Sequence, residues 1–126
     1  MIEDYFREIV ALINGDVSIQ GASVTYDKRT PYVGFLRGSL HFSDGSALHV
    51  REYINVQDAI DRYMYVYQYQ SPKGILLFRY DNSPHFPHLP TFPHHKHVGS
   101  ETNVVAANPM DLRAVLYEVH SLLELE

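Results

Sequence analysis

A strict alternation of residue types between positions 62 and 70 constrains the fold of this chain more than any other feature. The segment reads Arg-Tyr-Met-Tyr-Val-Tyr-Gln-Tyr-Gln, so that every second residue is a tyrosine. A period of two is the period of a β-strand, whose successive side chains point to opposite faces of a sheet. The sequence therefore predicts a sheet in which four tyrosines share one face of a strand. They are Tyr63, Tyr65, Tyr67 and Tyr69.

A turn sequence predicts a hairpin before this strand. Residues 33–42 and 47–54 flank Ser-Asp-Gly-Ser and are rich in the apolar and aromatic residues that strands favour. A three-residue loop with Gly45 in the left-handed region would place Leu40 opposite Leu48, whereas a two-residue turn would mix apolar and polar residues on each face. The sequence favours the three-residue loop.

A second hairpin is predicted after the tyrosine strand. Residues 75–82 follow Ser-Pro-Lys-Gly, in which proline suits the first corner of a turn and glycine a left-handed exit. The three-residue loop that this implies would place Tyr67 opposite Arg79 and Tyr65 opposite Asp81.

Helices are predicted near both ends of the chain. Residues 3–14 have apolar residues at helical spacing, and Asn108 followed by a proline predicts the start of a second helix. The apolar stripe of that helix is Leu112, Val115, Leu116, Val119, Leu122 and Leu123. Residues 17–27 predict a strand with a bulge at Gly21, and residues 55–61 predict a short connection or one helical turn.

These elements predict a single α+β domain over residues 1–126. About five antiparallel strands would follow one another in meander order, with an N-terminal and a C-terminal helix packed on one face. A long histidine- and proline-rich loop would precede the last helix, because residues 83–107 show no regular pattern. Two helices can cover only one face of such a sheet, so the other face is solvated or bound to something.

We expect the uncovered face to carry aromatic and basic side chains. The tyrosine side chains of residues 62–70 and Arg79 would lie on it. The preceding hairpin would add side chains from the odd-numbered positions of its two strands, namely Arg37, His49, Arg51 and Tyr53. Aromatic rings between arginines can stack bases and hold phosphates. A ladder of tyrosines is also ordinary strand chemistry, in which rings pack across neighbouring strands.

The interval from 85 to 97 holds five of the eight histidines together with three prolines. So many prolines exclude a helix or a central strand. Its imidazoles could bind Zn, Ni or Cu, or could transfer protons near neutral pH. Its apolar residues Phe86, Leu89 and Phe92 could instead dock a protein partner, or the loop could simply be rigid with solvated histidines. The sequence leaves these four readings open.

Composition narrows the class of protein. A net charge of −5 argues against a globally basic nucleic-acid binder, so that an RNA site would have to be a local positive patch. The chain has no cysteine, no apolar run of membrane-spanning length and no signal-peptide pattern at its start. We therefore expect a cytoplasmic protein without a membrane segment.

Four separated motifs carry a resemblance to a known family. They are His41-Phe-Ser-Asp-Gly-Ser-Ala-Leu-His-Val-Arg-Glu-Tyr53, Tyr63-Met-Tyr-Val-Tyr-Gln68, Phe78-Arg-Tyr-Asp-Asn82 and Thr91-Phe-Pro-His-His-Lys-His97. In this order they resemble the TumE family, over roughly residues 24–123. The resemblance implies the toxin half of a type II toxin–antitoxin pair, with a co-encoded antitoxin as partner. By analogy with other small toxins built from a helix and an antiparallel sheet, it implies a metal-independent endoribonuclease acting on RNA.

Side-chain chemistry suggests roles for the individual residues. Arg51 and Arg79 would hold the scissile phosphate, and Lys96 would lie near the leaving group. The base and the acid would come from His94, His95 and His97. The predicted substrate-binding residues are Tyr53, Tyr65, Tyr67 and Tyr80.

Two alternatives come from other functional classes. One is a non-enzymatic module that binds protein through an aromatic face, which could also support self-association into a homodimer. The other is a metal-binding protein. No cofactor is favoured, but Zn or Ni would be held by members of a single set, namely His85, His88, His94, His95 and His97.

Overall fold

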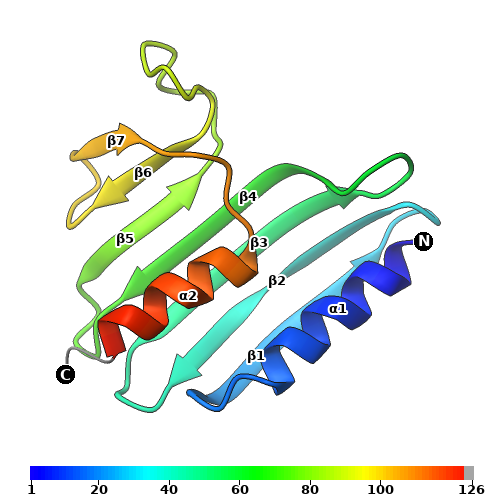
Figure 1. The fold of residues 1–126 in the computed structure, drawn as a ribbon, viewed down its shortest axis with the longest axis horizontal. Coiled ribbons are helices and arrows are strands. Elements are labelled where there is room, and N and C mark those ends of the chain that lie inside the picture. The colour runs from blue at the N-terminus through cyan, green and yellow to red at the C-terminus, as the bar shows by residue number, and fades with distance from the viewer. Residues whose placement is uncertain (124–126) are drawn as a thin grey trace.

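The computed structural model describes residues 1–123 and shows a seven-stranded antiparallel sheet with two helices on one face (Figure 1). The strands follow one another in chain order, which confirms the predicted meander and the α+β class. The elements are α1 (Ile2–Asn14), β1 (Ile19–Lys28), β2 (Val33–Phe42), β3 (Ala47–Asn55), β4 (Asp61–Gln70), β5 (Leu76–Asp81), β6 (His95–Val98), β7 (Val104–Ala106) and α2 (Leu112–Leu123).

The prediction of about five strands, with no regular structure in residues 83–107, is wrong. Strand β6 pairs antiparallel with β5, and β7 pairs with β6. The buried side chains of β6 are those of His95 and His97. The sequence therefore lacks the apolar alternation that would have predicted this short strand. Figure 1 shows that the rest of the loop lies beyond the ends of β5 and β6.

The first hairpin confirms its predicted register. Leu40 pairs with Leu48, and Gly45 has a φ of +91°, as the three-residue loop requires. The predicted bulge in β1 is also present, because the register shifts between Ile19 and Gly21. The short connection predicted between the third and fourth strands is confirmed as well.

The second hairpin begins in the predicted register and then leaves it. Gln70 pairs with Leu76 across a loop in which glycine has a φ of +83°, but a bulge at Leu77 shifts every later pair by one residue. The predicted pairs Tyr67–Arg79 and Tyr65–Asp81 are therefore wrong, and the observed ones are Tyr67–Tyr80 and Val66–Asp81.

Three tyrosines of β4 lie in the core beneath the helices, so the prediction that they line the uncovered face is wrong. Tyr65, Tyr67 and Tyr69 are at most 2% exposed, because they share a face with the apolar residues of β3. A buried tyrosine needs a partner for its hydroxyl group. The three partners are His94 Nδ1 at 2.8 Å, Glu52 Oε2 at 2.5 Å and Ser46 Oγ at 2.8 Å, in that order.

Helix α2 begins later than predicted. Its amide Ala114 N donates to Asp111 Oδ1 at 2.8 Å, so the helix cap is this aspartate and not Asn108. The predicted stripe is confirmed as the buried face of α2, with Leu112, Val115, Leu116 and Val119 in the core.

Candidate functional site

Two adjacent rows of mainly polar side chains cross the face of the sheet opposite the helices, which we call the open face. Direct Cα pairing across neighbouring strands places these side chains next to one another on one side of the sheet. The first row consists of Arg37, Arg51, Val66, Asp81 and His95. The second row consists of Ser39, His49, Gln68, Arg79 and His97.

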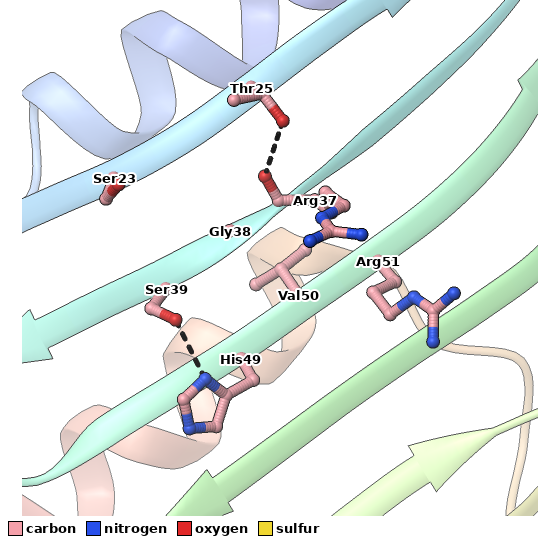
Figure 2. Close-up of a pocket in the computed structure, with 8 residues that line it drawn as sticks. All are labelled: Ser23, Thr25, Arg37, Gly38, Ser39, His49, Val50 and Arg51. Carbon is pink, nitrogen blue, oxygen red and sulfur yellow. Dashed lines mark hydrogen bonds between the residues drawn. The ribbon is translucent and has the colours of Figure 1, made fainter.

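The two arginines of the first row, Arg37 and Arg51, form an unusual pair. They are direct partners on β2 and β3, both are exposed, and Figure 2 shows both guanidinium groups on the open face. Among residues 1–123, no carboxylate pairs with either group. Like charges directly opposite on a sheet are destabilising, so the pair is suited to an anion that bridges it.

A pocket of about 540 Å³ surrounds the arginine pair. Its polar lining consists of Ser23, Thr25, Arg37, Ser39, His49 and Arg51. In this pocket His49 Nδ1 lies 2.8 Å from Ser39 Oγ, which orients the imidazole ring (Figure 2). The Nε2 atom of His49 makes no hydrogen bond to the described residues, so it is the ring atom that can take or give a proton to a ligand in the pocket.

An aromatic row borders the pocket on the open face. The ring centroids of Phe35 and Tyr53 are 4.4 Å apart, and those of Tyr53 and Tyr63 are 5.8 Å apart, with near-parallel planes in both cases. Tyr63 leaves the alternation of β4 because the register shifts between Tyr53 and Ile54, and it is 49% exposed. Stacked, partly exposed rings of this kind can receive nucleobases.

The predicted histidine–lysine group is divided between the two faces of the sheet, so the prediction that it forms one site is wrong. Lys96 Nζ donates to Glu118 Oε2 of α2 at 2.8 Å and therefore lies on the helix-covered face. His94 bonds the buried Tyr65 hydroxyl. The histidines on either side of Lys96 point to the open face, because neighbouring residues of a strand alternate.

His95 and His97 meet Asp81 on the open face. His95 Nε2 is 2.8 Å from Asp81 Oδ1, and His97 Nε2 is 3.5 Å from Asp81 Oδ2. The side chains are 1%, 4% and 3% exposed for His95, His97 and Asp81, with the ring of Phe86 4.7 Å from that of His95 and 5.9 Å from that of His97. Neither imidazole is accessible to a polymeric substrate in this arrangement.

Asp81 is held as a carboxylate. Burial opposes its ionisation, but hydrogen bonds from the Ser83 amide at 3.0 Å, the Ser83 hydroxyl at 2.8 Å and Arg79 Nε at 3.0 Å outweigh burial and lower the pKa of Asp81. Arg79 also donates to Glu101 Oε1 at 3.0 Å. The guanidinium group of Arg79 thus already has two acidic partners, unlike the arginines in the pocket.

The remaining predicted residues lie elsewhere. Tyr80 belongs to the core with Tyr65 and Tyr67, and its hydroxyl donates to Glu118 Oε1 at 2.5 Å, so Tyr53 is the only predicted substrate-binding tyrosine on the open face. The other two histidines that were considered as metal ligands, His85 and His88, are exposed. Neither belongs to the group of converging ligand atoms found among the described residues.

Comparison with known proteins identifies the family. The family model described as Toxin TumE matches residues 8–124. The chain belongs to the TumE toxin family. No curated protein and no solved structure matches the chain significantly.

Membership of the TumE family supports a toxin role and points to an antitoxin as partner. Neither helix of the described part of this TumE-family toxin has the length and apolar character needed to cross a membrane.

The sequence placed Arg37 and His49 of this TumE-family toxin on the open face, within the surface expected to hold phosphates, but neither was among the predicted catalytic or substrate-binding residues. The signal was present, because the loop that pairs Leu40 with Leu48 also pairs Arg37 with Arg51. Asp81 was missed for a different reason. Its neighbour across the sheet is His95 in β6, a strand that the sequence pattern does not reveal.

Proposed function

We propose that this TumE-family toxin is an endoribonuclease whose active surface is the pocket around Arg37, His49 and Arg51. The observation that carries the proposal is the arginine pair, whose exposed guanidinium groups lie on directly paired residues and have no carboxylate partner among residues 1–123. A phosphodiester between them would remove their mutual repulsion and accept charge-assisted hydrogen bonds from both. The pocket is thus the local positive patch that an RNA binder with a net charge of −5 needs.

The neighbouring side chains extend this interaction to a nucleotide. Tyr53 and Tyr63 offer stacked rings beside the arginine pair, and single-stranded RNA is commonly held by stacking its bases on aromatic side chains. Two types of contact, to phosphate and to base, therefore lie on one continuous surface of β2, β3 and β4.

His49 supplies the proton chemistry in this proposal. Its imidazole takes the proton of the RNA 2′-hydroxyl group as the 2′-oxygen bonds to phosphorus, and water protonates the departing 5′-oxygen. The arginines stabilise the charge that develops on the phosphoryl oxygens. Arg51 and Tyr53 keep their predicted roles, whereas proton transfer moves from the loop histidines to His49, because His95 and His97 are buried.

Purified toxin is expected to cleave RNA in the presence of EDTA, and His49→Gln is expected to lower the rate by about 10²–10⁴-fold, the usual cost of losing general acid–base catalysis. The measurement is cleavage of a labelled RNA by full-length protein, with folding checked by circular dichroism. His88→Gln is the matched control, because His88 is an exposed loop residue away from the pocket. Wild-type protein that inhibits growth but leaves RNA intact would contradict the ribonuclease proposal.

We also propose that the antitoxin neutralises the toxin by covering the open face. Hydrogen exchange of the toxin with and without the product of the neighbouring gene is expected to show protection in β2, β3 and β4. Protection confined to α2 would exclude a shared surface.

The alternative of a non-enzymatic aromatic module loses most of its surface, because Tyr65, Tyr67 and Tyr69 are buried. Self-association through the open face would appear in the same samples as a concentration-dependent mass in sedimentation equilibrium.

A further inference from the structure

We propose that Asp81, His95 and His97 form a binding site for one divalent first-row transition-metal ion, with Zn²⁺ as the representative. A ligand atom from each residue lies within 4.8 Å of those of the other two. The arrangement follows from strand geometry, because the two histidines are two residues apart on one face of β6 and Asp81 is the direct partner of His95 on β5.

The hydrogen bonds of the two imidazoles set their tautomers. His95 Nδ1 lies 3.0 Å from the carbonyl oxygen of Pro93, and His97 Nδ1 lies 2.9 Å from the carbonyl oxygen of Glu101. A carbonyl oxygen only accepts hydrogen bonds, so both Nδ1 atoms carry their protons. In the neutral ring, Nε2 then presents a lone pair, which is the arrangement of metal-binding histidines whose other nitrogen is held by a backbone carbonyl.

Both lone pairs are buried and lack hydrogen-bond partners. Nε2 of His95 and Nε2 of His97 are shielded from solvent and accept or donate no hydrogen bond in the described structure. At 2.8 Å from Asp81 Oδ1, a bare Nε2 of His95 would repel the carboxylate unless a cation lies between them. One divalent ion bound by both Nε2 atoms and by the carboxylate would give these buried atoms the partner that they lack.

The donor set selects the kind of ion. Two imidazole nitrogens and one carboxylate suit Zn²⁺, Ni²⁺ or Fe²⁺, whereas Mg²⁺ and Ca²⁺ prefer oxygen ligands alone. Asp81 Oδ2 accepts one hydrogen bond, from Arg79 Nε, and so retains a lone pair for a metal. Ser83 holds the other oxygen through its amide and its hydroxyl group, which orients the carboxylate.

The surroundings point to a structural ion. The ring of Phe86 makes edge-on contacts with both imidazoles, and the three ligands join β5 to β6 at the point where the intervening loop leaves the sheet. Binding would therefore tie the loop to the sheet and stabilise the fold. Strand β4 separates this site from the arginine pair, so the proposed ribonuclease chemistry does not require the metal ion.

The test uses untagged full-length protein stripped with EDTA and titrated with Zn²⁺ in competition with a chromophoric chelator. One Zn²⁺ per chain is expected, without competition from Mg²⁺. Asp81→Asn, His95→Gln and His97→Gln should each weaken binding by about 100-fold or more, at least the cost of losing an outer-shell partner. His85→Gln and His88→Gln are matched controls from the exposed part of the loop and should bind as wild type does.

A second measurement on the wild type guards against variants that fail to fold. Zn²⁺ should shift the Nε2 resonances of His95 and His97 in ¹⁵N NMR spectra while both Nδ1 protons stay bound. It should also raise Tm by roughly 10 °C at a free concentration 100 times the Kd. The proposal would be overturned if Zn²⁺ did not bind stoichiometrically, or if His95→Gln and His97→Gln bound it with wild-type affinity. It would also be overturned if His95 carried protons on both ring nitrogens and Zn²⁺ did not displace the proton on Nε2. Any of these results would leave a histidine–aspartate ion pair only. RNA cleavage by the stripped protein is scored separately, so failure of either proposal is recognised without the other.

Discussion

Alanine at Arg37 or at Arg51 is expected to lower RNA cleavage by about 10²–10³-fold and to abolish growth inhibition, because each removes a preorganised cation from the scissile phosphate. Arg51→Lys should restore only part of the rate, since a lysine cannot reproduce the bidentate contact. Because both arginines are proposed to hold one anion, the double variant should lose much less than the product of the single losses. The measurement is the rate of cleavage of a labelled RNA by each purified variant.

Stability separates this role from a structural one. The two guanidinium groups are exposed partners that repel each other, so removal of either should leave the free energy of unfolding unchanged or raise it by a few tenths of a kcal/mol. Arg113→Ala, an exposed change on α2, is the matched control and should keep full activity. Variants of Arg37 and Arg51 that are folded and fully toxic would exclude the pocket as the active surface.

Replacement of Glu52 by alanine is expected to lower the free energy of unfolding by about 3–5 kcal/mol, the range found when one partner of a buried charged network is removed. Glu52 is fully buried and accepts hydrogen bonds from the hydroxyl groups of Tyr5 and Tyr67, with Arg62 Nε 3.9 Å from Oε2. Alanine would leave two buried hydroxyl groups without an acceptor. Urea denaturation measures the loss, and Glu8→Ala on the exposed side of α1 is the control, expected within about 0.5 kcal/mol of wild type.

The pH dependence of Glu52 has a definite sign. Burial raises the pKa of Glu52 above its ordinary value of 4.5, against the lowering effect of hydrogen bonds from Tyr5 and Tyr67. A carboxyl group with a raised pKa in the folded state contributes stability that is fully present below the unfolded pKa and is lost as pH rises through the folded pKa. Wild type should therefore match Glu52→Gln at low pH and become less stable relative to it as pH rises above about 4.5. A difference that is flat with pH would show that this carboxyl group keeps an ordinary pKa.

Local sequence patterns were sufficient for the elements whose signals are short-range. The helix at residues 2–14, the first five strands and the glycines of both three-residue loops follow from periodicity and turn chemistry. The pairing of Arg37 with Arg51 also follows, because the loop of one hairpin sets the register of its two strands. The arginine pair at the centre of the proposed active surface was thus within reach of sequence reasoning.

Long-range packing set the rest, beginning with the orientation of β4. Both faces of that strand are compatible with a core, since tyrosines alternate with Met64 and Val66. Pairing with the apolar face of β3 turned Tyr65 and Tyr67 inward, where their hydroxyl groups find partners that are distant in sequence. A pattern of residue types cannot supply those partners, because buried polar groups are satisfied by whichever atoms the fold brings near.

The histidine loop illustrates the same limit most clearly. Its five histidines look alike in the sequence, but pairing of β6 with β5 gives them different surroundings. The alternation of side chains along β6 places His95 and His97 on one face of the sheet and Lys96 on the other. The bulge at Leu77 sets the register between β4 and β5, and this register places Asp81 on the open face opposite Val66. The convergence of Asp81 with the two histidines depends on strand pairing between segments about 14 residues apart, a cooperative property of the sheet that local residue preferences do not encode.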